Sequence, residues 1–318
     1  MKVLVTGATG MIGRVVVRQL QQAQVEVRIA SRHPETLGSA NDAVLLPNSD
    51  APAAAFVAMM QDITHVVHCA ALNSDAGNAG DADYLAANGA LTGQLARAAA
   101  ARASGRFIYL SSIRAVVGPN FSGTINEATS PTPQCAYGRS KREGEIRTLE
   151  AYASRPSDAT ALRLPPIYGE GMKGNLATLM RLAGMPVNLP LPAAVFSGIR
   201  SLMSREAAAQ TVVYLLSRPQ PLRPVYVACD VPPLPISAII GAFRLGFGLS
   251  LRLSAVPAGP LRAAAALLGK GKAWDAMTAT QICDPSLLVA EGWAPQTDTL
   301  ERLAELARRS RSGAAQPR

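Results

Sequence analysis

The sequence predicts an α/β protein in which a doubly wound parallel sheet is followed by a smaller C-terminal lobe. Short apolar runs rich in β-branched residues alternate with longer stretches of helical periodicity in the first part of the chain. The short runs are apolar almost throughout, which is typical of strands covered by helices on both faces. The length of 318 residues suits one large domain or two joined ones.

The predicted elements follow one another regularly from the N-terminus. The strands are expected at 3–5, 25–32, 43–48, 63–71, 105–113 and 159–169. Helices are expected after the first strand, through Val15 to Leu20, and at 84–103 and 136–154. In a sheet of this kind ligands bind outside the carboxyl ends of the strands, so the polar residues at those ends are the candidates for a site.

The character of the chain changes after about Gly169, where prolines become frequent and the segments between them become short. We therefore expect a dinucleotide-binding domain over 1–168, to which later segments of the chain can also contribute. A smaller substrate-binding lobe is expected over 169–308, and a flexible basic tail over 309–318.

Composition excludes several classes of protein. The formal net charge is +9, but the basic residues are scattered and have no aromatic residues interleaved among them, which argues against a nucleic-acid partner and favours a basic groove for a small anion. The four cysteines are far apart and the three histidines form no ligand pattern, so neither a disulfide framework nor a metal site is expected.

No membrane-spanning segment is expected. The most apolar region, 242–270, is interrupted by Arg244, Arg252, Arg262 and Pro257. The N-terminal apolar run is too short for a signal peptide, which makes the cytoplasm the expected compartment.

Three glycines, Gly7, Gly10 and Gly13, stand at three-residue spacing between the first strand and the first helix. Glycine permits a tight turn and lets a pyrophosphate approach the amide groups at the helix N-terminus. The pattern predicts a Rossmann-type dinucleotide site rather than a plain strand–helix turn.

The end of the second strand indicates which dinucleotide binds. A site for NAD usually offers a carboxylate to the ribose 2′-hydroxyl at this position. Here the strand ends in Ser31 and Arg32, whose hydroxyl and guanidinium suit a 2′-phosphate, while Glu26 and Glu35 stand in the wrong places. NADP is therefore slightly favoured over NAD.

Tyr137 and Lys141 are four residues apart in a predicted helix and so share one face. An ammonium beside a phenol favours the phenolate and lowers the pKa of the tyrosine from its ordinary value of about 10. A phenol tuned in this way serves as a general base in oxidation and as a general acid in reduction.

The glycine motif, the serine pair Ser111 and Ser112 ending the fifth strand, and Tyr137-x-x-x-Lys141 together resemble the short-chain dehydrogenase/reductase superfamily, in its extended branch of NAD(P)-dependent nucleotide-sugar epimerases and dehydratases. The likeness is strongest to bacterial UDP-sugar 4-epimerases. It also covers "HCAA" at His68 to Ala71, Asn88, "LRLPPIYGEG" from Leu162, "KGN" from Lys173 and "EGWAP" from Glu291.

The resemblance implies roles for individual residues. It makes Ser112, Tyr137 and Lys141 catalytic, with Ser111 as the rival of Ser112, and it places Ser112, Asn175 and Arg200 at the substrate. Lys141 also holds the nicotinamide ribose. The residues implied or predicted at the cofactor are Gly7, Thr9, Gly10, Met11, Ile12, Gly13, Ser31, Arg32, Asn48, Ala70, Ala71, Tyr137, Lys141, Pro165 and Ile167.

The activity implied is a nucleotide-sugar 4-epimerase that oxidises C4 transiently. The alternative is an NADPH-dependent reductase of a keto sugar or another carbonyl compound, which Arg32 supports. A sensor that binds NADP without catalysis is a third class, but such relatives usually lack the tyrosine–lysine pair. The resemblance also implies a homodimer formed through the helices at 84–103 and 136–152, where small residues such as Ala86, Ala90, Gly93 and Ala100 permit close approach.

Overall fold

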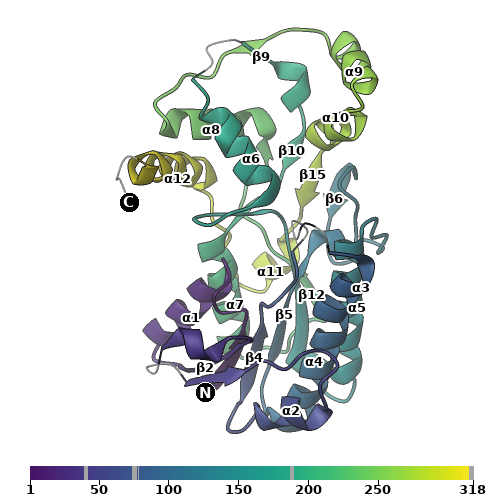
Figure 1. The fold of residues 1–318 in the computed structure, drawn as a ribbon, viewed down its shortest axis with the longest axis vertical. Coiled ribbons are helices and arrows are strands. Elements are labelled where there is room, and N and C mark those ends of the chain that lie inside the picture. Colours follow the sequence, from purple (N-terminus) through teal and green to yellow (C-terminus); the bar gives the residue numbers. More distant parts are fainter. Residues whose placement is uncertain (39–41, 74–76, 78, 187–189, 315–318) are drawn as a thin grey trace.

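The computed structural model describes residues 1–38, 42–73, 77, 79–186 and 190–314. A seven-stranded, fully parallel sheet forms its centre and confirms the predicted fold class (Figure 1). Across the sheet the strands run in the order β12 (Val225–Val227), β7 (Ala159–Leu164), β5 (Phe107–Ser112), β4 (His65–His68), β1 (Lys2–Thr6), β2 (Glu26–Ser31) and β3 (Asp42–Leu45).

Helices cover both faces of this sheet, as the apolar strands predicted (Figure 1). On one face α1 (Gly13–Gln22) packs against α7 (Arg205–Ser217), and their apolar side chains join those of the strands in one core. The second core, on the opposite face, lies under α2 (Ala53–Ala58), α4 (Leu91–Arg102) and α5 (Ala136–Ala151). A short helix α3 (Asp81–Tyr84) and a π-helical segment, Leu85–Ala90, precede α4 without a break.

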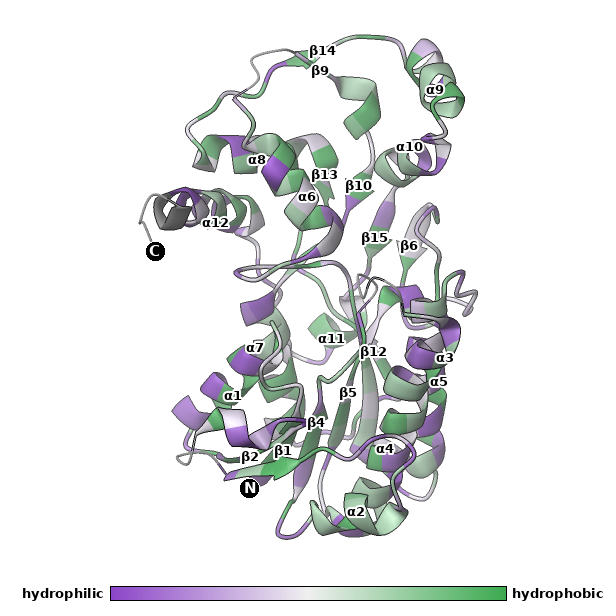
Figure 2. Ribbon diagram, in the orientation of Figure 1, coloured by the Kyte–Doolittle hydropathy of each residue, from purple (hydrophilic) through white to green (hydrophobic). Residues whose placement is uncertain are grey.

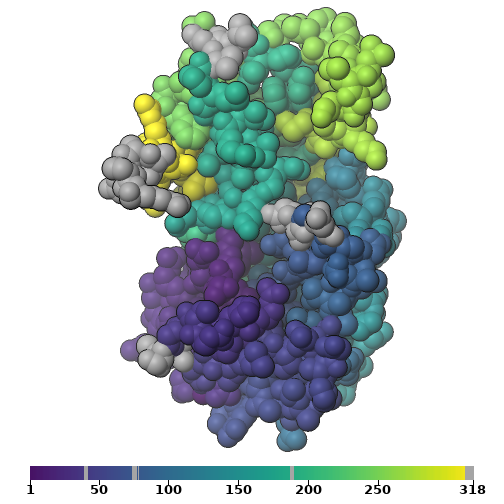
Figure 3. Space-filling model, in the orientation of Figure 1, coloured from purple at the N-terminus to yellow at the C-terminus, as the bar shows by residue number. Residues whose placement is uncertain are grey.

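The smaller lobe is built mainly from the later part of the chain and stands above the carboxyl ends of the strands (Figures 1 and 3). Its core contains side chains of α6 (Gly174–Ala183), α8 (Ile236–Gly246) and α12 (Thr299–Ala314). Its short strands are β9 (Leu191–Pro192), β10 (Ile199–Arg200), β13 (Leu234–Pro235), β14 (Leu253–Ser254) and β15 (Gln281–Cys283), and β6 (Gly123–Ile125) joins β15 from the first domain. Two further helices, α9 (Ala258–Leu267) and α10 (Gly271–Thr278), form its outer edge.

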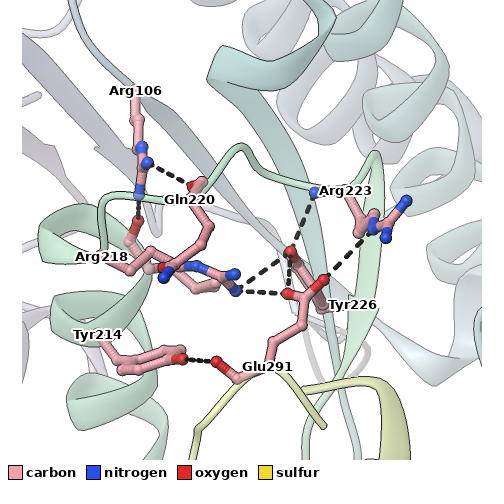
Figure 4. Close-up of polar contacts among 8 residues, drawn as sticks. Arg106, Tyr214, Arg218, Gln220, Arg223, Tyr226 and Glu291 are labelled. Atoms are coloured by element: carbon pink, nitrogen blue, oxygen red, sulfur yellow. Dashed lines mark hydrogen bonds and ion pairs between the residues drawn. The ribbon is translucent and has the colours of Figure 1, made fainter.

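The chain returns to the first domain after entering the lobe, since α7 and β12 both belong to the layers around the large sheet. Figure 4 shows how the returning segments are held together. Glu291, which follows α11 (Ser286–Ala290), accepts hydrogen bonds from Arg218 and, at 2.6 Å, from the hydroxyl of Tyr226. Its backbone oxygen accepts another from Tyr214 in α7 at 2.5 Å. One carboxylate thus ties the end of α7 to the edge strand β12.

The C-terminal helix continues into the expected basic tail. Helix α12 runs through Ala314, while residues 315–318 lie outside the described residues. Arg309 forms an i, i+4 ion pair with Glu305 at 2.7 Å, and Arg311 donates to the backbone oxygen of Phe247 at 2.7 Å. These contacts extend the helix beyond residue 308, where the tail was expected to begin.

A buried aspartate lies at the joint between the two lobes. The Oδ2 atom of Asp230 accepts hydrogen bonds from the Tyr168 hydroxyl at 2.9 Å, the Ser204 amide at 3.0 Å and the Thr299 hydroxyl at 3.3 Å. Burial raises the pKa of this carboxyl to about 6, although the hydrogen bonds oppose the shift. The three donors come from β8 (Ile167–Tyr168), β11 (Met203–Ser204) and α12, so Asp230 fastens three segments to one point.

The anchor of α5 is a fully buried carboxylate. Glu145 is 0% exposed and accepts both Nε and Nη2 of Arg163, in β7, at 2.9 Å. Ser111 at the end of β5 donates to it at 2.6 Å and Arg142 donates at 2.8 Å. Burial alone raises the pKa of a carboxyl, but the hydrogen bonds and charge of Arg163 outweigh it, so the pKa of Glu145 lies below its usual value and the group is ionised.

We expect Glu145→Ala to destabilise the protein strongly, because it leaves Arg163 charged and unpaired in the core. Removing one partner of a buried ion pair typically costs about 3–5 kcal/mol. Glu143→Ala is the matched control, since Glu143 lies on the same helix in a partly exposed pair with Arg147, and such pairs are worth about 0–1 kcal/mol. Urea unfolding of both variants measures the difference, and similar losses would contradict the anchoring role.

Candidate active site

The glycine turn between β1 and α1 has the geometry that a pyrophosphate needs. Gly7 has a positive φ of 67°, and a Cβ there would lie 2.6 Å from the backbone nitrogen of Ala70. A Cβ on Gly13 would lie 2.2 Å from the carbonyl oxygen of Gly7. No side chain fits at either position, so the backbone of the turn stays open toward a ligand at the start of α1.

One long cleft extends from this turn to the smaller lobe. Every residue predicted to contact the cofactor lies on its wall, from Gly7 to Gly13, through Ser31, Arg32, Asn48, Ala70 and Ala71, to Tyr137, Lys141, Pro165 and Ile167. The residues predicted at the substrate, Ser112, Asn175 and Arg200, lie on the same wall. Residues separated by almost two hundred positions in the chain therefore border one continuous space, whose glycine-lined end suits the pyrophosphate of a dinucleotide.

The two serines at the end of β5 point in different directions. Ser111 is 5% exposed and its hydroxyl donates to Glu145. Ser112 is half-buried, and its oxygen accepts a hydrogen bond from the Arg114 amide at 3.2 Å. Both serines line the cleft, but the Ser111 hydroxyl is engaged in the buried network, which makes Ser112 the more accessible of the two.

Tyr137 lies in the first turn of α5, one turn before Lys141. Its ring meets that of Tyr84 edge to face, with centroids 6.3 Å apart. The Cys135 sulfur caps the helix by accepting from the Gly138 amide at 3.3 Å. The cap and the aromatic contact hold the phenol at the wall of the cleft, which Ser112 also lines.

Lys141 is 2% exposed and its ammonium points into the domain. Nζ donates to the Leu110 carbonyl at 2.5 Å and lies 4.2 Å from the centroid of the Tyr109 ring. Burial lowers the pKa of Lys141 to about 7, against the opposing influence of Glu145. The side chain is therefore close to the point of releasing its proton at neutral pH.

A neutral histidine supports the loop opposite the glycine turn. His68 is fully buried, and its ring nitrogens lie 2.6 Å from the hydroxyl of Thr6 and 2.9 Å from that of Thr92. Burial, together with the nearby charge of Lys141, lowers the pKa of His68 to about 3. Thr6 in turn accepts from the Ala70 amide at 3.2 Å, which fixes the backbone that borders the cleft.

Asn88, on the π-helical segment, holds the next part of the same loop. Its amide group donates to the Leu72 carbonyl and to the Ser140 hydroxyl, both at 2.9 Å, and its Oδ1 accepts from the Leu72 amide at 2.8 Å. The side chain is 0% exposed. It links the loop after β4 to α5, so it positions the wall of the cleft rather than lining it.

At the far end of the cleft Arg200 is half-buried and already bonded. Its guanidinium donates to the Ile199 carbonyl at 2.9 Å and to the carbonyls of Ala276 and Ala279, at the C-terminal end of α10. Burial and the neighbouring charge of Arg114 lower the pKa of Arg200 to about 10. Arg200 thus lines the cleft while it holds α10 in place.

Two cations on this wall, Arg114 and Lys173, were not among the site residues predicted from the sequence. Arg114 lines the cleft and donates to the Gly118 carbonyl at 2.7 Å and to Gln281 at 3.0 Å. Lys173 lines it as an exposed side chain. The position of Arg114, two residues after Ser112, is a signal that could have found it. With Arg200 these residues make the far end of the cleft basic.

At the end of β2 the structure places Ser31 and Arg32 on the cleft wall, with Arg32 exposed. The Ser31 oxygen accepts from the His33 amide at 3.1 Å.

Within the described ranges, no group of three or more histidine, cysteine or acidic side chains is arranged to hold a metal ion. No helix in the part of the chain that the structure describes is long and apolar enough to cross a membrane.

The fold and the cleft together define an enzyme of the short-chain dehydrogenase/reductase type that uses a nicotinamide dinucleotide. The chain belongs to the NAD dependent epimerase/dehydratase family, whose model matches residues 3–191. It is 28% identical over 305 residues to a UDP-glucose 4-epimerase of Vibrio cholerae, covering 92% of this chain and 90% of the relative.

Solved structures of low sequence identity share the fold over the whole length. One is MoeE5 in complex with UDP-glucuronic acid and NAD, with a TM-score of 0.74, 21% identity, and coverage of 98% of this chain and 100% of the other. Another is a dTDP-4-dehydrorhamnose reductase from Clostridium acetobutylicum, with a TM-score of 0.71, 18% identity, and coverage of 98% and 100%. The family description names NAD, and neither it nor these structures supports the preference for NADP expected from Ser31 and Arg32.

We expect the stability of the ligand-free protein to rise with pH because of Lys141. Its pKa is about 7 in the folded chain and 10.5 for an ordinary lysine, so between these values the unfolded chain binds more protons than the folded one. Stability therefore rises across this window, and burial of the ammonium costs most below it. Lys141→Met removes this titration, so its unfolding free energy should rise less than that of the parent when measured by urea unfolding across the same range.

Lys173→Met is the matched control, since it replaces an exposed lysine on the same cleft. A Lys141→Met profile parallel to those of the parent and of this control would contradict a titration of Lys141 in that range.

Proposed function

We propose that the protein is an NAD(P)-dependent nucleotide-sugar 4-epimerase. The proposal rests mainly on one observation, that a single cleft is lined by Ser112, Tyr137 and Lys141. This cleft has a glycine turn at one end and a basic wall with Arg200 at the other. The likeness to a UDP-glucose 4-epimerase over nearly the whole chain supports the same assignment.

Each of these residues has a role that follows from its position in the cleft. Arg200, with Arg114 and Lys173 nearby, binds the diphosphate, since guanidinium groups bind phosphate oxygens well. Tyr137 removes the proton of the sugar 4-hydroxyl and later returns it, while Ser112 donates a hydrogen bond to the same oxygen. When bound at the glycine turn, the dinucleotide supplies reversible hydride transfer. Binding energy from the diphosphate keeps the sugar in the cleft while its ring turns over.

A panel of UDP-, GDP- and dTDP-sugars, assayed for inversion at C4, tests the proposal against simple ketones assayed for NADPH oxidation. We expect inversion of at least one nucleotide sugar, and a loss of about 10²–10⁴-fold in Tyr137→Phe because a general acid–base group is removed. Dinucleotide binding by this variant should be retained. Turnover of uncharged ketones without any response to nucleotide sugars would defeat the epimerase assignment.

The second candidate is an NADPH-dependent reductase of a keto sugar or another carbonyl compound. Arg32, on the cleft wall at the end of β2, favours it, because a reductase commonly draws on the phosphorylated cofactor. The dinucleotide that co-purifies with the protein distinguishes the two. An epimerase regenerates its cofactor in each cycle and retains it, whereas a reductase releases it and needs fresh NADPH.

We further propose that NADP binds more tightly than NAD, on the strength of Ser31 and the exposed Arg32 at the end of β2. Arg32→Glu should weaken NADP selectively by repelling the 2′-phosphate. Titration of the apoprotein with both dinucleotides measures the preference, and tighter or equal binding of NAD by the parent would refute it.

Arg200→Ala should raise KM for the nucleotide sugar strongly and leave the affinity for the dinucleotide nearly unchanged, since Arg200 lies at the far end of the cleft. Because Arg200 also bonds the end of α10, melting temperatures of variant and parent must accompany the kinetics. An unchanged KM would remove Arg200 from the diphosphate site.

We also propose a homodimer in the cytoplasm. The four cysteines are free, which suits a reducing compartment. Ile146 on α5 is 37% exposed and Leu85 before α4 is 45% exposed, on the pair of helices expected at the interface. Gly93, in contrast, packs within the chain, because a Cβ there would lie 2.8 Å from the Arg147 side chain. Light scattering tests the dimer directly.

A further inference from the structure

Helix α9 and the segment before it form an exposed apolar surface at the outer edge of the smaller lobe. None of the residues of α9 is buried. Leu267 is 89% exposed and Leu268 is 74% exposed, and Leu253 and Val256 are also open to solvent. Figure 2 shows α9 projecting from the lobe with apolar residues along it. Large apolar side chains gathered in one exposed segment indicate an interaction site.

The charges carried by residues 252–272 are all of one sign. Between Asp230 and Asp275 the sequence contains no aspartate or glutamate. The exposed cations there are Arg252 and Arg262 beside the apolar residues, and Lys270 and Lys272 just after them. On helix α12, in contrast, Arg309 pairs with Glu305. The charge of the partner should therefore be negative.

We propose that the surface formed by residues 252–272 docks on an anionic lipid bilayer. Apolar side chains that enter the interface and flanking lysines and arginines that reach the headgroups are the combination by which helices lie on membranes. The apolar part is too short to span a bilayer, so the contact is peripheral. A helix that is exposed on all sides can insert its apolar side chains into the interfacial layer of a bilayer. A folded acidic protein has no such layer.

Helix α10 connects this docking surface to the far end of the cleft. Helix α9 packs on α10, and Ala276 and Met277 of α10 line the far end of the cleft. The inference concerns a surface outside the cleft and does not depend on the proposed reaction.

Flotation of the full chain with phosphatidylcholine vesicles, with and without phosphatidylglycerol, tests the proposal. We expect the parent to float with the anionic vesicles. The double variant Leu267→Ser, Leu268→Ser should bind them about tenfold more weakly, because two exposed leucines no longer enter the interface. The pair Lys270→Gln and Lys272→Gln should reduce the preference for anionic over neutral vesicles.

Leu45→Ser is the matched control, since Leu45 is 61% exposed on β3, in the other domain. It should bind vesicles as the parent does. Failure of the parent to float with anionic vesicles, or an equal loss in Leu45→Ser, would overturn the proposal. A lower solution mass of the Leu267/Leu268 variant by light scattering, with vesicle binding unchanged, would overturn it in favour of a second copy of the chain.

Discussion

The position of helix α5 is set by the buried ion pair between Glu145 and Arg163, and the geometry of the cleft depends on that position. Tyr137, Lys141 and Glu145 are spaced four apart and so share one face of the helix. Because Glu145 is fixed to β7 and β5 by Arg163 and Ser111, this face must point at the sheet. The same carboxylate engages the hydroxyl of Ser111, whereas the neighbouring Ser112 makes no hydrogen bond with it.

Glycines allow the helix to come as close as this ion pair requires. A Cβ on Gly144 would lie 2.3 Å from the Tyr109 hydroxyl and 2.6 Å from the Asn88 carbonyl, and one on Gly138 would lie 2.3 Å from the Arg114 carbonyl. The close approach brings the Lys141 ammonium to a carbonyl of β5 and removes it from water. Its lowered pKa is therefore a consequence of backbone packing, as is the neutral state of His68 beside it.

The sequence predicted those parts of the site that depend on local spacing. The glycine turn and the pair Tyr137 and Lys141 are short motifs whose geometry follows from one turn or one helix. The Glu145–Arg163 pair joins residues 18 apart on different elements, and Arg163 stood in a run that indicated only a strand. The return of β12 to the sheet, likewise, depends on contacts made by Glu291, far away in the chain, and no local pattern could indicate it.

Arg200 shows why the far end of the cleft is harder to derive than the glycine turn. Its guanidinium lies on the cleft wall but is held by carbonyls at the end of α10, which carry the partial negative charge of a helix C-terminus. A substrate diphosphate competes with these carbonyls for the same N–H donors of Arg200. The affinity for the substrate therefore depends on how strongly the end of α10 binds the guanidinium. Helix α10 also packs against α9. This one short helix therefore positions both the apolar surface at the edge of the lobe and the basic wall of the cleft.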